Sequence, residues 1–165
     1  MSHASHANAT LCQERKNLKK PRLTMSQGRI KRGFEAAKKA SMNSTFKQHH
    51  LGSAIMYKGS ILAVGYNMNK TSPVQKRLNF ARGFDIEASG MNHTLHSETV
   101  VLGKIKALDV DFSKMELFVY RQHKDGKCAI ARPCPACMQL IKEMGIKNIY
   151  YTTYDGYAHE VIEYD

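Results

Sequence analysis

Hydrophobic residues recur at helical spacing over residues 27–41, where Ile30, Phe34 and Ala37 fall on one face and lysines on the other. Serine is a residue type that often caps a helix at its N-terminus, and Ser26 stands directly before this stretch. The pattern therefore predicts an amphipathic helix over 27–41 that is capped by Ser26.

The next stretch, residues 53–67, is apolar on both sides of Lys58-Gly59. Two apolar runs that flank a short turn predict a β-hairpin. Residues 68–95 are polar, show little strict period, and contain one proline and two glycines. A segment of this length without a clear period is often a lid or binding loop, so we expect a loop here.

The second half of the chain alternates between helical and strand patterns. The predicted elements are a helix over 96–108, a strand over 115–122, a turn over 124–127, a helix over 134–144 that Gly145 ends, and strands over 147–154 and 158–164. The resulting order is helix, strand, strand, helix, strand, helix, strand, strand.

The relative direction of the last two strands follows from the length of chain that remains. Only residues 154–165 follow Thr153, whereas a parallel connection needs a crossover of about a dozen residues before its strand begins. Asp155-Gly156 is also a strong hairpin signal. We therefore expect these two strands to pair antiparallel.

Composition places the chain among globular proteins of one domain, with 165 residues and 42% hydrophobic content. No apolar run is long enough to span a bilayer, and the polar N-terminus lacks the apolar stretch of a signal peptide. Residues 1–24 show no hydrophobic period, so we expect a flexible basic tail over 1–24 and a folded domain over 25–165. We expect no membrane association and a cytoplasmic location.

The positive charge is concentrated at one end. Residues 1–50 carry eleven Lys/Arg and two Glu, which is +9 of the net +11, whereas the remaining 115 residues carry +2. A basic stretch of this kind could bind the phosphates of single-stranded nucleic acid, or it could be a solvated surface.

Two short motifs carry the chemistry: His96-Ser97-Glu98 and the PCPAC run over 133–137. One histidine and two cysteines make three zinc ligands and leave the fourth tetrahedral position open, as catalytic zinc sites do. Glu98 is not needed to hold the metal, but a glutamate at this place can move protons. The motifs therefore predict a zinc hydrolase that activates water.

The spacing of these residues suits the starts of two helices. Cys134 and Cys137 are three residues apart, so a helix places both sulfurs on one face of its first turn, where backbone N–H groups stabilise thiolates. His96 and Glu98 would diverge in the middle of a helix, but at its N-terminus both can reach a target beyond the helix end. We expect two helix starts to converge on one ion.

An alternative interpretation is a structural zinc site that His93 or His123 completes as fourth ligand. That interpretation leaves Glu98 without a purpose. The other two cysteines, Cys12 and Cys128, need not pair, and this usage fits a reducing compartment better than a disulfide scaffold.

The order H-x-E…P-C-x-x-C is the signature of zinc-dependent nucleobase deaminases. On HSE, PCPAC and Gly65-Tyr66-Asn67, the chain resembles the cytidine deaminase-like superfamily over about residues 27–165. The resemblance implies an α/β fold, a three-layer α/β/α sandwich with a five-stranded mixed sheet. It also implies Zn²⁺ on His96, Cys134 and Cys137, with Glu98 as the catalytic proton shuttle.

The same resemblance implies the contacts with substrate. Asn67 matches an asparagine that hydrogen-bonds the sugar or base, and the backbone around Ser97 and Pro133 would hold the carbonyl and exocyclic amine of a pyrimidine. Many relatives have alanine where Ser97 stands. The terminal hairpin resembles the branch that contains free cytidine deaminases and several toxin deaminases, and relatives often form homo-oligomers.

The motifs do not name the substrate, so three functions remain open. The first is conversion of cytosine to uracil on a free (deoxy)cytidine nucleoside or nucleotide, which the nearly neutral domain favours. Arg77, Arg82 or Arg132 could then meet a 5′-phosphate.

The second is deamination of cytosine or adenine in single-stranded DNA or RNA, which the basic N-terminal third favours and in which Phe80 and Phe84 could stack on bases. The third is a non-catalytic nucleic-acid-binding module that zinc stabilises. The intact Glu98 argues against the third, because a binding module needs no proton shuttle.

Overall fold

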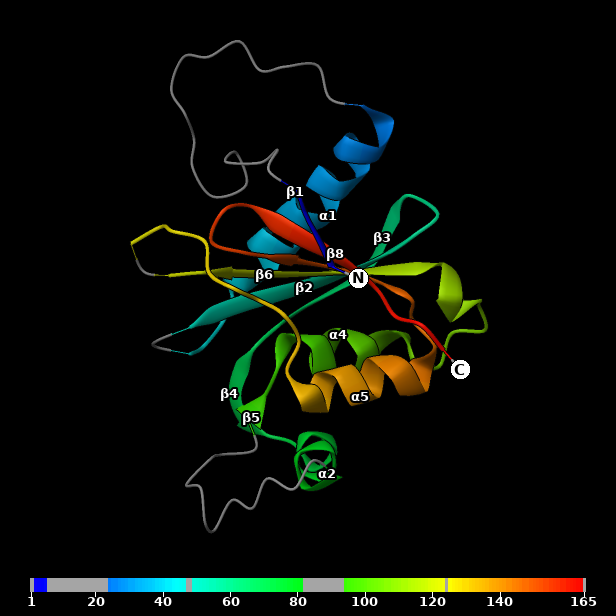
Figure 1. Cartoon of the computed structure of the whole chain (residues 1–165). Helices are drawn as coiled ribbons and strands as arrows, with labels where there is room; N and C mark the ends of the chain where they lie inside the picture. The colour runs from blue at the N-terminus through cyan, green and yellow to red at the C-terminus, as the bar shows by residue number, and fades with distance from the viewer. Residues whose placement is uncertain (1, 6–23, 47–48, 82–93, 124, 165) are drawn as a thin grey trace.

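A computed structural model describes residues 2–5, 24–46, 49–81, 94–123 and 125–164. A central sheet separates two layers of helices, with α1 (Met25–Ser41) on one face and α4 (Ser97–Ile105) and α5 (Pro135–Met144) on the other (Figure 1). The shorter helix α2 (Pro73–Ala81) lies beyond α4 and α5, farther from the sheet. The protein therefore has the expected α/β/α architecture.

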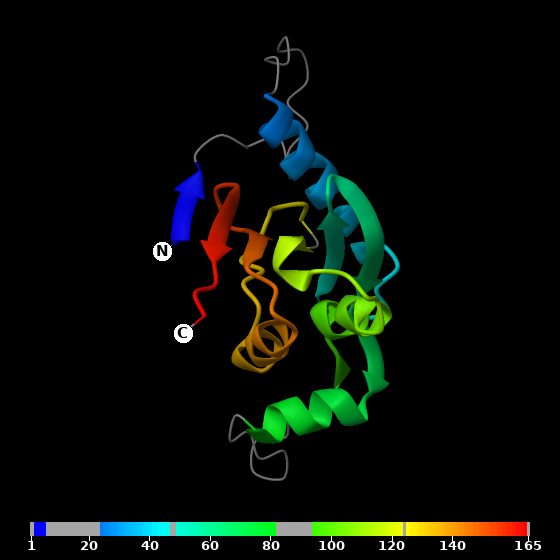
Figure 2. The same ribbon diagram turned by 90° about the vertical axis from the view of Figure 1, so that its right-hand side faces the viewer.

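The sheet has the strand order β1-β8-β7-β6-β2-β3 (Figure 2). Its strands are β1 (Ser2–Ser5), β2 (His50–Tyr57), β3 (Ser60–Tyr66), β6 (Met115–Gln122), β7 (Asn148–Thr152) and β8 (Tyr157–Val161). Strands β6 and β7 pair parallel and the other neighbours pair antiparallel. The five strands from β8 to β3 form the expected five-stranded mixed sheet.

Strand β1 extends this sheet at the β8 edge, where Ser2 pairs with Glu160 and Ser5 with Tyr157. The sequence did not predict this strand, because the N-terminal residues lack the alternation of apolar and polar positions that marks a half-buried strand. The rest of the predicted tail, residues 6–23, lies outside the described residues.

Helix α1 confirms the predicted helix, but the predicted cap is wrong. Thr24, not Ser26, is the N-cap: its hydroxyl oxygen accepts from the backbone N–H of Gln27 at 3.2 Å. The Gln27 side-chain oxygen accepts from the backbone N–H of Thr24 at 3.0 Å. This reciprocal capping box satisfies two backbone donors, whereas a cap at Ser26 would offer no such return bond.

The predicted hairpin is confirmed as β2 and β3. Its turn residues Lys58 and Gly59 both have positive φ, 50° and 80°. Two positive φ values are typical of the turn whose twist matches that of the flanking strands, and glycine adopts them at little cost.

The predicted loop over 68–95 is wrong over its first half. Residues there form β4 (Met68–Thr71), which pairs with β5 (Thr94–Leu95), and helix α2. The helix starts at Pro73, and the Ser72 hydroxyl accepts from the backbone N–H of Gln75 at 3.4 Å. Residues 82–93 lie outside the described residues.

In the second half of the chain, the predicted order of elements is confirmed. Helices α4 and α5 each begin one residue later than predicted, so that His96 and Cys134 are their N-caps. Gly145 ends α5 with φ 85°, as predicted. Strands β7 and β8 pair antiparallel across the Asp155-Gly156 turn.

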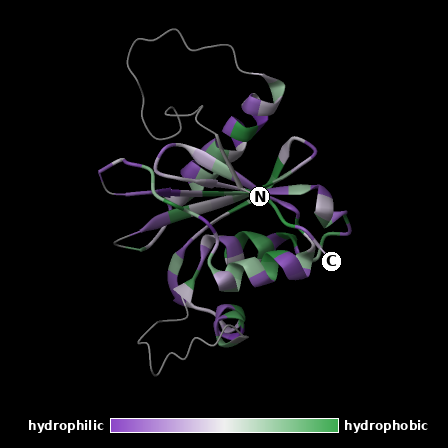
Figure 3. Cartoon of the chain, in the orientation of Figure 1, coloured by the Kyte–Doolittle hydropathy of each residue, from purple (hydrophilic) through white to green (hydrophobic). Residues whose placement is uncertain are grey.

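Two hydrophobic cores lie on opposite faces of the sheet. Alternate residues of β6 enter them: Leu117 and Val119 pack towards α4 and α5, whereas Phe118 and Tyr120 pack towards α1. Figure 3 shows the hydrophobic character of α4 and the mixed character of α1. No helix in the described parts of the chain is both long and apolar enough to cross a membrane.

Candidate metal centre and active site

The structure brings the three predicted metal ligands together. The Nδ1 atom of His96 and the Sγ atoms of Cys134 and Cys137 all lie within 4.8 Å of one another. His96 Nδ1 is 3.3 Å from the sulfur of Cys137 and 3.5 Å from that of Cys134. Residues about 40 positions apart in the chain thus form one cluster.

The cluster forms because two helices begin at the same place. His96 has the extended backbone of an N-cap, with φ −82° and ψ 153°, and follows β5 directly. Cys134 has the same conformation, with φ −65° and ψ 165°, and Pro135 starts α5 behind it. Cys137 is the third residue of α5, so its sulfur lies on the first turn. Both helix N-termini therefore face the cluster, as the motif spacing predicted.

The donor set fits zinc. Zinc–sulfur and zinc–nitrogen bonds of about 2.3 and 2.1 Å in a tetrahedron place neighbouring ligand atoms about 3.6 Å apart, close to the two distances from His96 Nδ1. Among the described residues no fourth His, Cys, Asp or Glu joins the group. His123 lies outside it and is exposed, while His93 is not described.

The pKa values of the two cysteines shift in opposite directions. A hydrogen bond with Cys137 lowers the pKa of Cys134 to about 4, while the same hydrogen bond, burial and the charge of Glu98 raise the pKa of Cys137. Burial lowers the pKa of His96, but its hydrogen bond with Cys134 and the charge of Glu98 outweigh this, so the pKa is raised. Zinc binding therefore has to displace the Cys137 proton.

Glu98 is only 3% exposed and lies in the first turn of α4. The Ser97 hydroxyl donates to its Oε1 at 2.5 Å, and the Ser53 and Ser97 hydroxyl oxygens are 2.7 Å apart. Since Ser97 has a single hydroxyl proton, Ser53 donates to Ser97. A chain of two buried hydroxyls therefore holds the carboxylate beside the ligands.

The close approach of β3 to α4 fixes the position of the first turn of α4 against the sheet. A Cβ atom on Gly65 would lie 2.8 Å from the Val101 backbone nitrogen and 2.9 Å from the Ser97 carbonyl oxygen. Only glycine lets the strand and the helix pack this closely.

The predicted substrate contacts lie on segments around the cluster. Asn67 follows β3 and is 7% exposed; its Oδ1 accepts from the Leu51 backbone N–H at 3.0 Å and from the Ser44 hydroxyl. Its Nδ2 donates to the His49 carbonyl oxygen at 2.8 Å. Pro133 is buried directly before Cys134. Asn67 thus anchors the start of β2.

The arginines and phenylalanines that the sequence suggests for substrate binding do not gather at the cluster: the two described arginines are ion-paired and the described phenylalanine is exposed. Arg77 pairs with Glu143 at 3.7 Å, and Arg132 forms two hydrogen bonds with Glu160 at 2.8 and 3.0 Å. Phe80 is 53% exposed on α2. Arg82 and Phe84 lie outside the described residues.

Sequence reasoning missed two groups of residues around the cluster. Thr99 and Gln75 are buried and hydrogen-bonded to each other behind Cys137. The signal for Gln75 was present in Ser72-Pro73-Val74-Gln75, which has the spacing of a capping box with proline at the first helical position. Arg121 and His49 form the second group, with Arg121 Nη2 3.1 Å from His49 Nδ1; their pairing depends on strand register, so the sequence carried no local signal.

The cysteine usage differs from the expectation. Cys134 and Cys137 are free, whereas Cys128, which is 6% exposed, is disulfide-bonded. The cysteines therefore give no support to a reducing compartment, and the cytoplasmic location stays a prediction.

Comparison with known proteins gives a family match. Residues 28–153 match the family described as the cytidine and deoxycytidylate deaminase zinc-binding region. No curated protein matches the chain.

Two solved structures are similar to the chain. One is the crystal structure of dCMP deaminase from the cyanophage S-TIM5 in apo form, with 25% identity, a TM-score of 0.47, and coverage of 75% of this chain and 82% of that chain. The other is the dCMP deaminase of the same phage in complex with dCMP and dUMP, with 25% identity, a TM-score of 0.44, and coverage of 77% and 79%.

Proposed function

Because the chain belongs to the cytidine and deoxycytidylate deaminase zinc-binding family, we propose that it converts the cytosine of a free (deoxy)cytidine nucleotide to uracil and ammonia. The family and the cluster make it a zinc enzyme whose ligands are His96, Cys134 and Cys137. The observation that carries the proposal is the buried Glu98 carboxylate, which lies at the same helix start as the ligand histidine and has no role in holding the metal.

The chemistry divides between the metal and this carboxylate. When bound, zinc supplies a Lewis acid that lowers the pKa of water to about 7. Glu98 would accept one proton of the attacking water and deliver it to the ring nitrogen of cytosine as the oxygen adds to the neighbouring carbon. It would then carry the second proton of the same oxygen to the amine, which leaves as ammonia, so that Glu98 ends unchanged and the ring becomes uracil.

The substrate contacts are part of the proposal. Asn67 donates its remaining amide hydrogen to the sugar or base, and the backbone at Ser97 and Pro133 holds the carbonyl and exocyclic amine of the pyrimidine. The positions of these residues support this: Ser97 starts α4, Pro133 precedes Cys134, and Asn67 follows the strand that packs against the start of α4.

Arg121 supports a nucleotide over a nucleoside. It is partly buried on the α4 and α5 side of β6, its Nε atom is buried without a hydrogen-bond partner, and no carboxylate pairs with it among the described residues. Its backbone N–H donates to Thr152 Oγ1 at 3.1 Å, and Thr152 donates to the Ala129 carbonyl oxygen on the segment that leads to Cys134.

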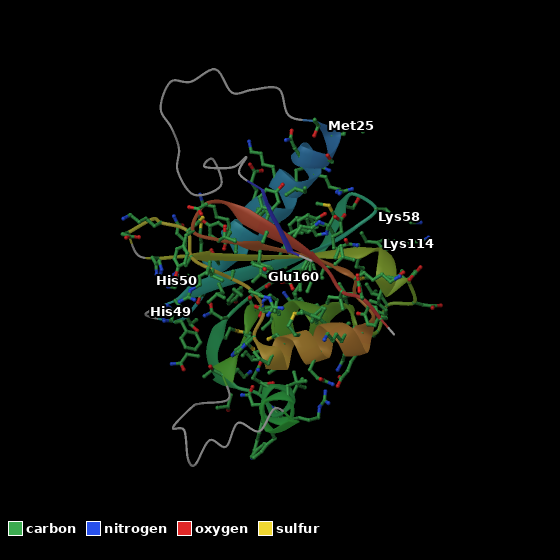
Figure 4. All side chains as sticks on the ribbon, in the orientation of Figure 1. Met25, His49, His50, Lys58, Lys114 and Glu160 are labelled. Carbon is green, nitrogen blue, oxygen red and sulfur yellow. The ribbon has the colours of Figure 1, made fainter. Side chains whose placement is uncertain are left out.

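His49 forms a hydrogen-bonded pair with Arg121 at this end of the sheet, and burial together with the Arg121 charge lowers the pKa of His49. Figure 4 shows His49 and His50 at one end and Lys58 and Lys114 at the opposite end. Asn67 binds the carbonyl oxygen of His49, so the pair is tied to a proposed substrate residue. A guanidinium without an anionic partner is suited to a 5′-phosphate.

The test is ammonia release by zinc-loaded protein from a panel of cytidine, deoxycytidine, CMP, dCMP, dCTP, adenosine, guanine, and single-stranded DNA and RNA. Turnover of a cytosine monophosphate is expected, and Glu98→Gln should reduce it by about 10²-fold or more. The matched control is Glu35→Gln on α1, across the sheet, which should keep full activity. Silence of the wild-type protein on every compound would contradict the proposal.

A separate substitution tests whether the substrate is a nucleotide rather than a nucleoside. Arg121→Gln should raise KM for dCMP about tenfold or more and leave KM for deoxycytidine unchanged. Arg32→Gln, an exposed arginine on α1, is the matched control. Equal changes in KM for the two substrates would show that Arg121 does not bind the phosphate.

A second candidate, deamination of single-stranded nucleic acid, is favoured by one observation. Phe80 is an exposed aromatic on α2, and the Lys76 ammonium lies 5.9 Å from the centre of its ring. An aromatic face beside a cation suits base stacking next to a phosphate. Turnover of the polymers alone, with an affinity that falls steeply as salt rises, would support this candidate.

A further inference from the structure

A chain of three buried polar side chains lies behind the cysteine ligand Cys137. Thr99 of α4 is 6% exposed, and Gln75 and Asn79 of α2 are 0% and 6% exposed. The Thr99 oxygen is 3.8 Å from the Cys137 sulfur, and its hydroxyl donates to Gln75 Oε1 at 2.7 Å. Gln75 Nε2 in turn donates to Asn79 Oδ1 at 3.1 Å.

Packing alone does not account for this choice of residues. Burying an amide or hydroxyl costs free energy unless it is hydrogen-bonded, and leucine-like residues would fill the same space between helices without that cost. Gln75, Leu78 and Asn79 share one face of α2, and only Leu78 is apolar. The two polar residues of this face are the ones that Thr99 connects to the metal ligand Cys137 through hydrogen bonds.

The hydrogen bonds of Thr99 have to change when the metal binds. A zinc-bound cysteine sulfur carries no proton, so it can only accept hydrogen bonds. Thr99 has a single hydroxyl proton, which in this structure goes to Gln75. For Thr99 to serve the sulfur, Gln75 has to offer a donor instead of an acceptor. A half-turn of its side-chain amide does so without moving the backbone, and a matching half-turn of the Asn79 amide then presents Nδ2 to Gln75 Oε1.

We propose that Thr99 is a positioning residue of the zinc site, with its hydroxyl donating to the zinc-bound Cys137 sulfur while Gln75 of α2 holds that hydroxyl in place. Outer groups that hydrogen-bond metal ligands orient them and tune the affinity for the metal. Helix α2, which the sequence places in a loop, is then part of the metal centre.

A second link supports the coupling of α2 to the ligands. Arg77 of α2 pairs with Glu143 of α5 at 3.7 Å. Because Cys137 is in the first turn of α5, α2 is connected to this ligand both through Thr99 and through the helix that carries it. A change in α2 should therefore be measurable at the metal.

The test replaces the hydroxyl while keeping the shape. We expect Thr99→Val to weaken zinc binding about tenfold or more, measured by competition with a chromophoric chelator. In the cobalt-substituted protein the same variant should shift the thiolate-to-cobalt charge-transfer band. Thr99→Ser, which keeps the hydroxyl, should restore both the affinity and the band position. Equal weakening by valine and serine would show a packing effect and overturn the proposal.

Gln75→Leu tests the second step of the chain. It should shift the cobalt band in the same direction as Thr99→Val but weaken zinc binding less, because the hydroxyl remains and only its orientation is lost. Should Thr99→Val fail to fold, this cobalt spectrum decides the question. A wild-type spectrum in Gln75→Leu would contradict the role of α2.

The matched control is Ser41→Ala, which removes another buried helix hydroxyl on the opposite side of the sheet. Ser41 is 5% exposed and donates to the Lys38 carbonyl oxygen at 2.6 Å. Its loss should leave zinc affinity and the cobalt spectrum unchanged. None of these readouts requires a substrate, so a protein that binds zinc as expected but deaminates nothing would contradict only the proposed function.

Discussion

Single residues decide what the carboxylate of Glu98 can do. Its burial excludes water from most of the group, and the hydroxyls of Ser97 and Ser53 replace part of that solvation with donors at fixed positions. Ser97 therefore contributes a hydrogen bond to the proposed proton shuttle.

Ser97→Ala should lower kcat about tenfold, which corresponds to about 1.4 kcal/mol for one hydrogen bond to a charged group, and should leave zinc content unchanged. The reason is that Glu98 keeps its place in the helix but loses the donor that orients it. Steady-state kinetics on the preferred substrate, with metal analysis of both proteins, measures the effect. An unchanged kcat would mean that the helix alone orients Glu98.

At the scale of elements, the site depends on how α4 and α5 are placed against the sheet. Strand β3 reaches the start of α4 through Gly65, and the segment before α5 is tied to β8 through Arg132 and Glu160. The ligands are short side chains at helix starts, so a small displacement of either helix separates them.

Gly65→Ala should destabilise the protein by about 1–3 kcal/mol and weaken zinc binding, because the new methyl group collides with backbone atoms of α4. Gly103, within α4, is the matched control: a Cβ there meets nothing within 4 Å. Gly103→Ala should stabilise the helix by about 0.5–1 kcal/mol. Urea unfolding and chelator competition measure the two effects. A harmless Gly65→Ala would show that α4 can shift without consequence.

The Arg132–Glu160 pair should make stability depend on pH. Its hydrogen bonds lower the pKa of Glu160 below the ordinary value of 4.5. The carboxylate is therefore bound more tightly in the folded state, so this stabilisation is complete above the unfolded pKa and is lost as pH falls through the folded pKa.

Glu160→Gln should cost about 0.5 kcal/mol at about pH 7, a small value because Arg132 is half exposed, and less at about pH 3, where the carboxylate of the unfolded chain is protonated. Urea unfolding at the two pH values measures the difference. Glu163→Gln, an exposed glutamate on the same C-terminal segment, is the control and should show no such pH dependence. A cost that is undiminished at low pH would argue against the ion pair.

At the scale of the whole molecule, the family match and the two hydrophobic cores indicate which part of the chain forms the catalytic domain. The family match covers residues 28–153, and both cores lie within residues 25–165. We therefore propose that residues 25–165 are the deaminase domain and that residues 1–24 are not required for turnover of a free nucleotide.

A protein truncated to residues 25–165 should keep kcat and KM for the free nucleotide within about twofold and show little dependence on salt. Its stability should fall, because the truncation exposes the edge of β8 and leaves Cys128 without a disulfide partner, the other remaining cysteines being the two free metal ligands. Kinetics at low and high salt, beside the full chain, provide the measurement. Loss of activity on polymers after truncation would instead give the basic N-terminal segment a role in nucleic-acid binding.

Local spacing made most of the fold and the ligand set predictable. The hairpin at Lys58-Gly59, the strand over 115–122 and the end of α5 at Gly145 each depend on residues within a few positions of one another. Helix α2 was missed because its short apolar pattern is weak and two of its buried positions are polar. Its stability depends on contacts with α4 and α5, which are distant in sequence.

The sequence by itself determined the metal ligands, the carboxylate beside them and the order of most helices and strands, because helical periods, caps and turns are local properties of the chain. The tertiary structure alone decided which polar side chains meet around the site: Ser53 behind Ser97, Gln75 behind Thr99, and His49 beside Arg121. Each pair joins residues 24 or more positions apart, and their contact depends on strand register and helix packing rather than on any local pattern.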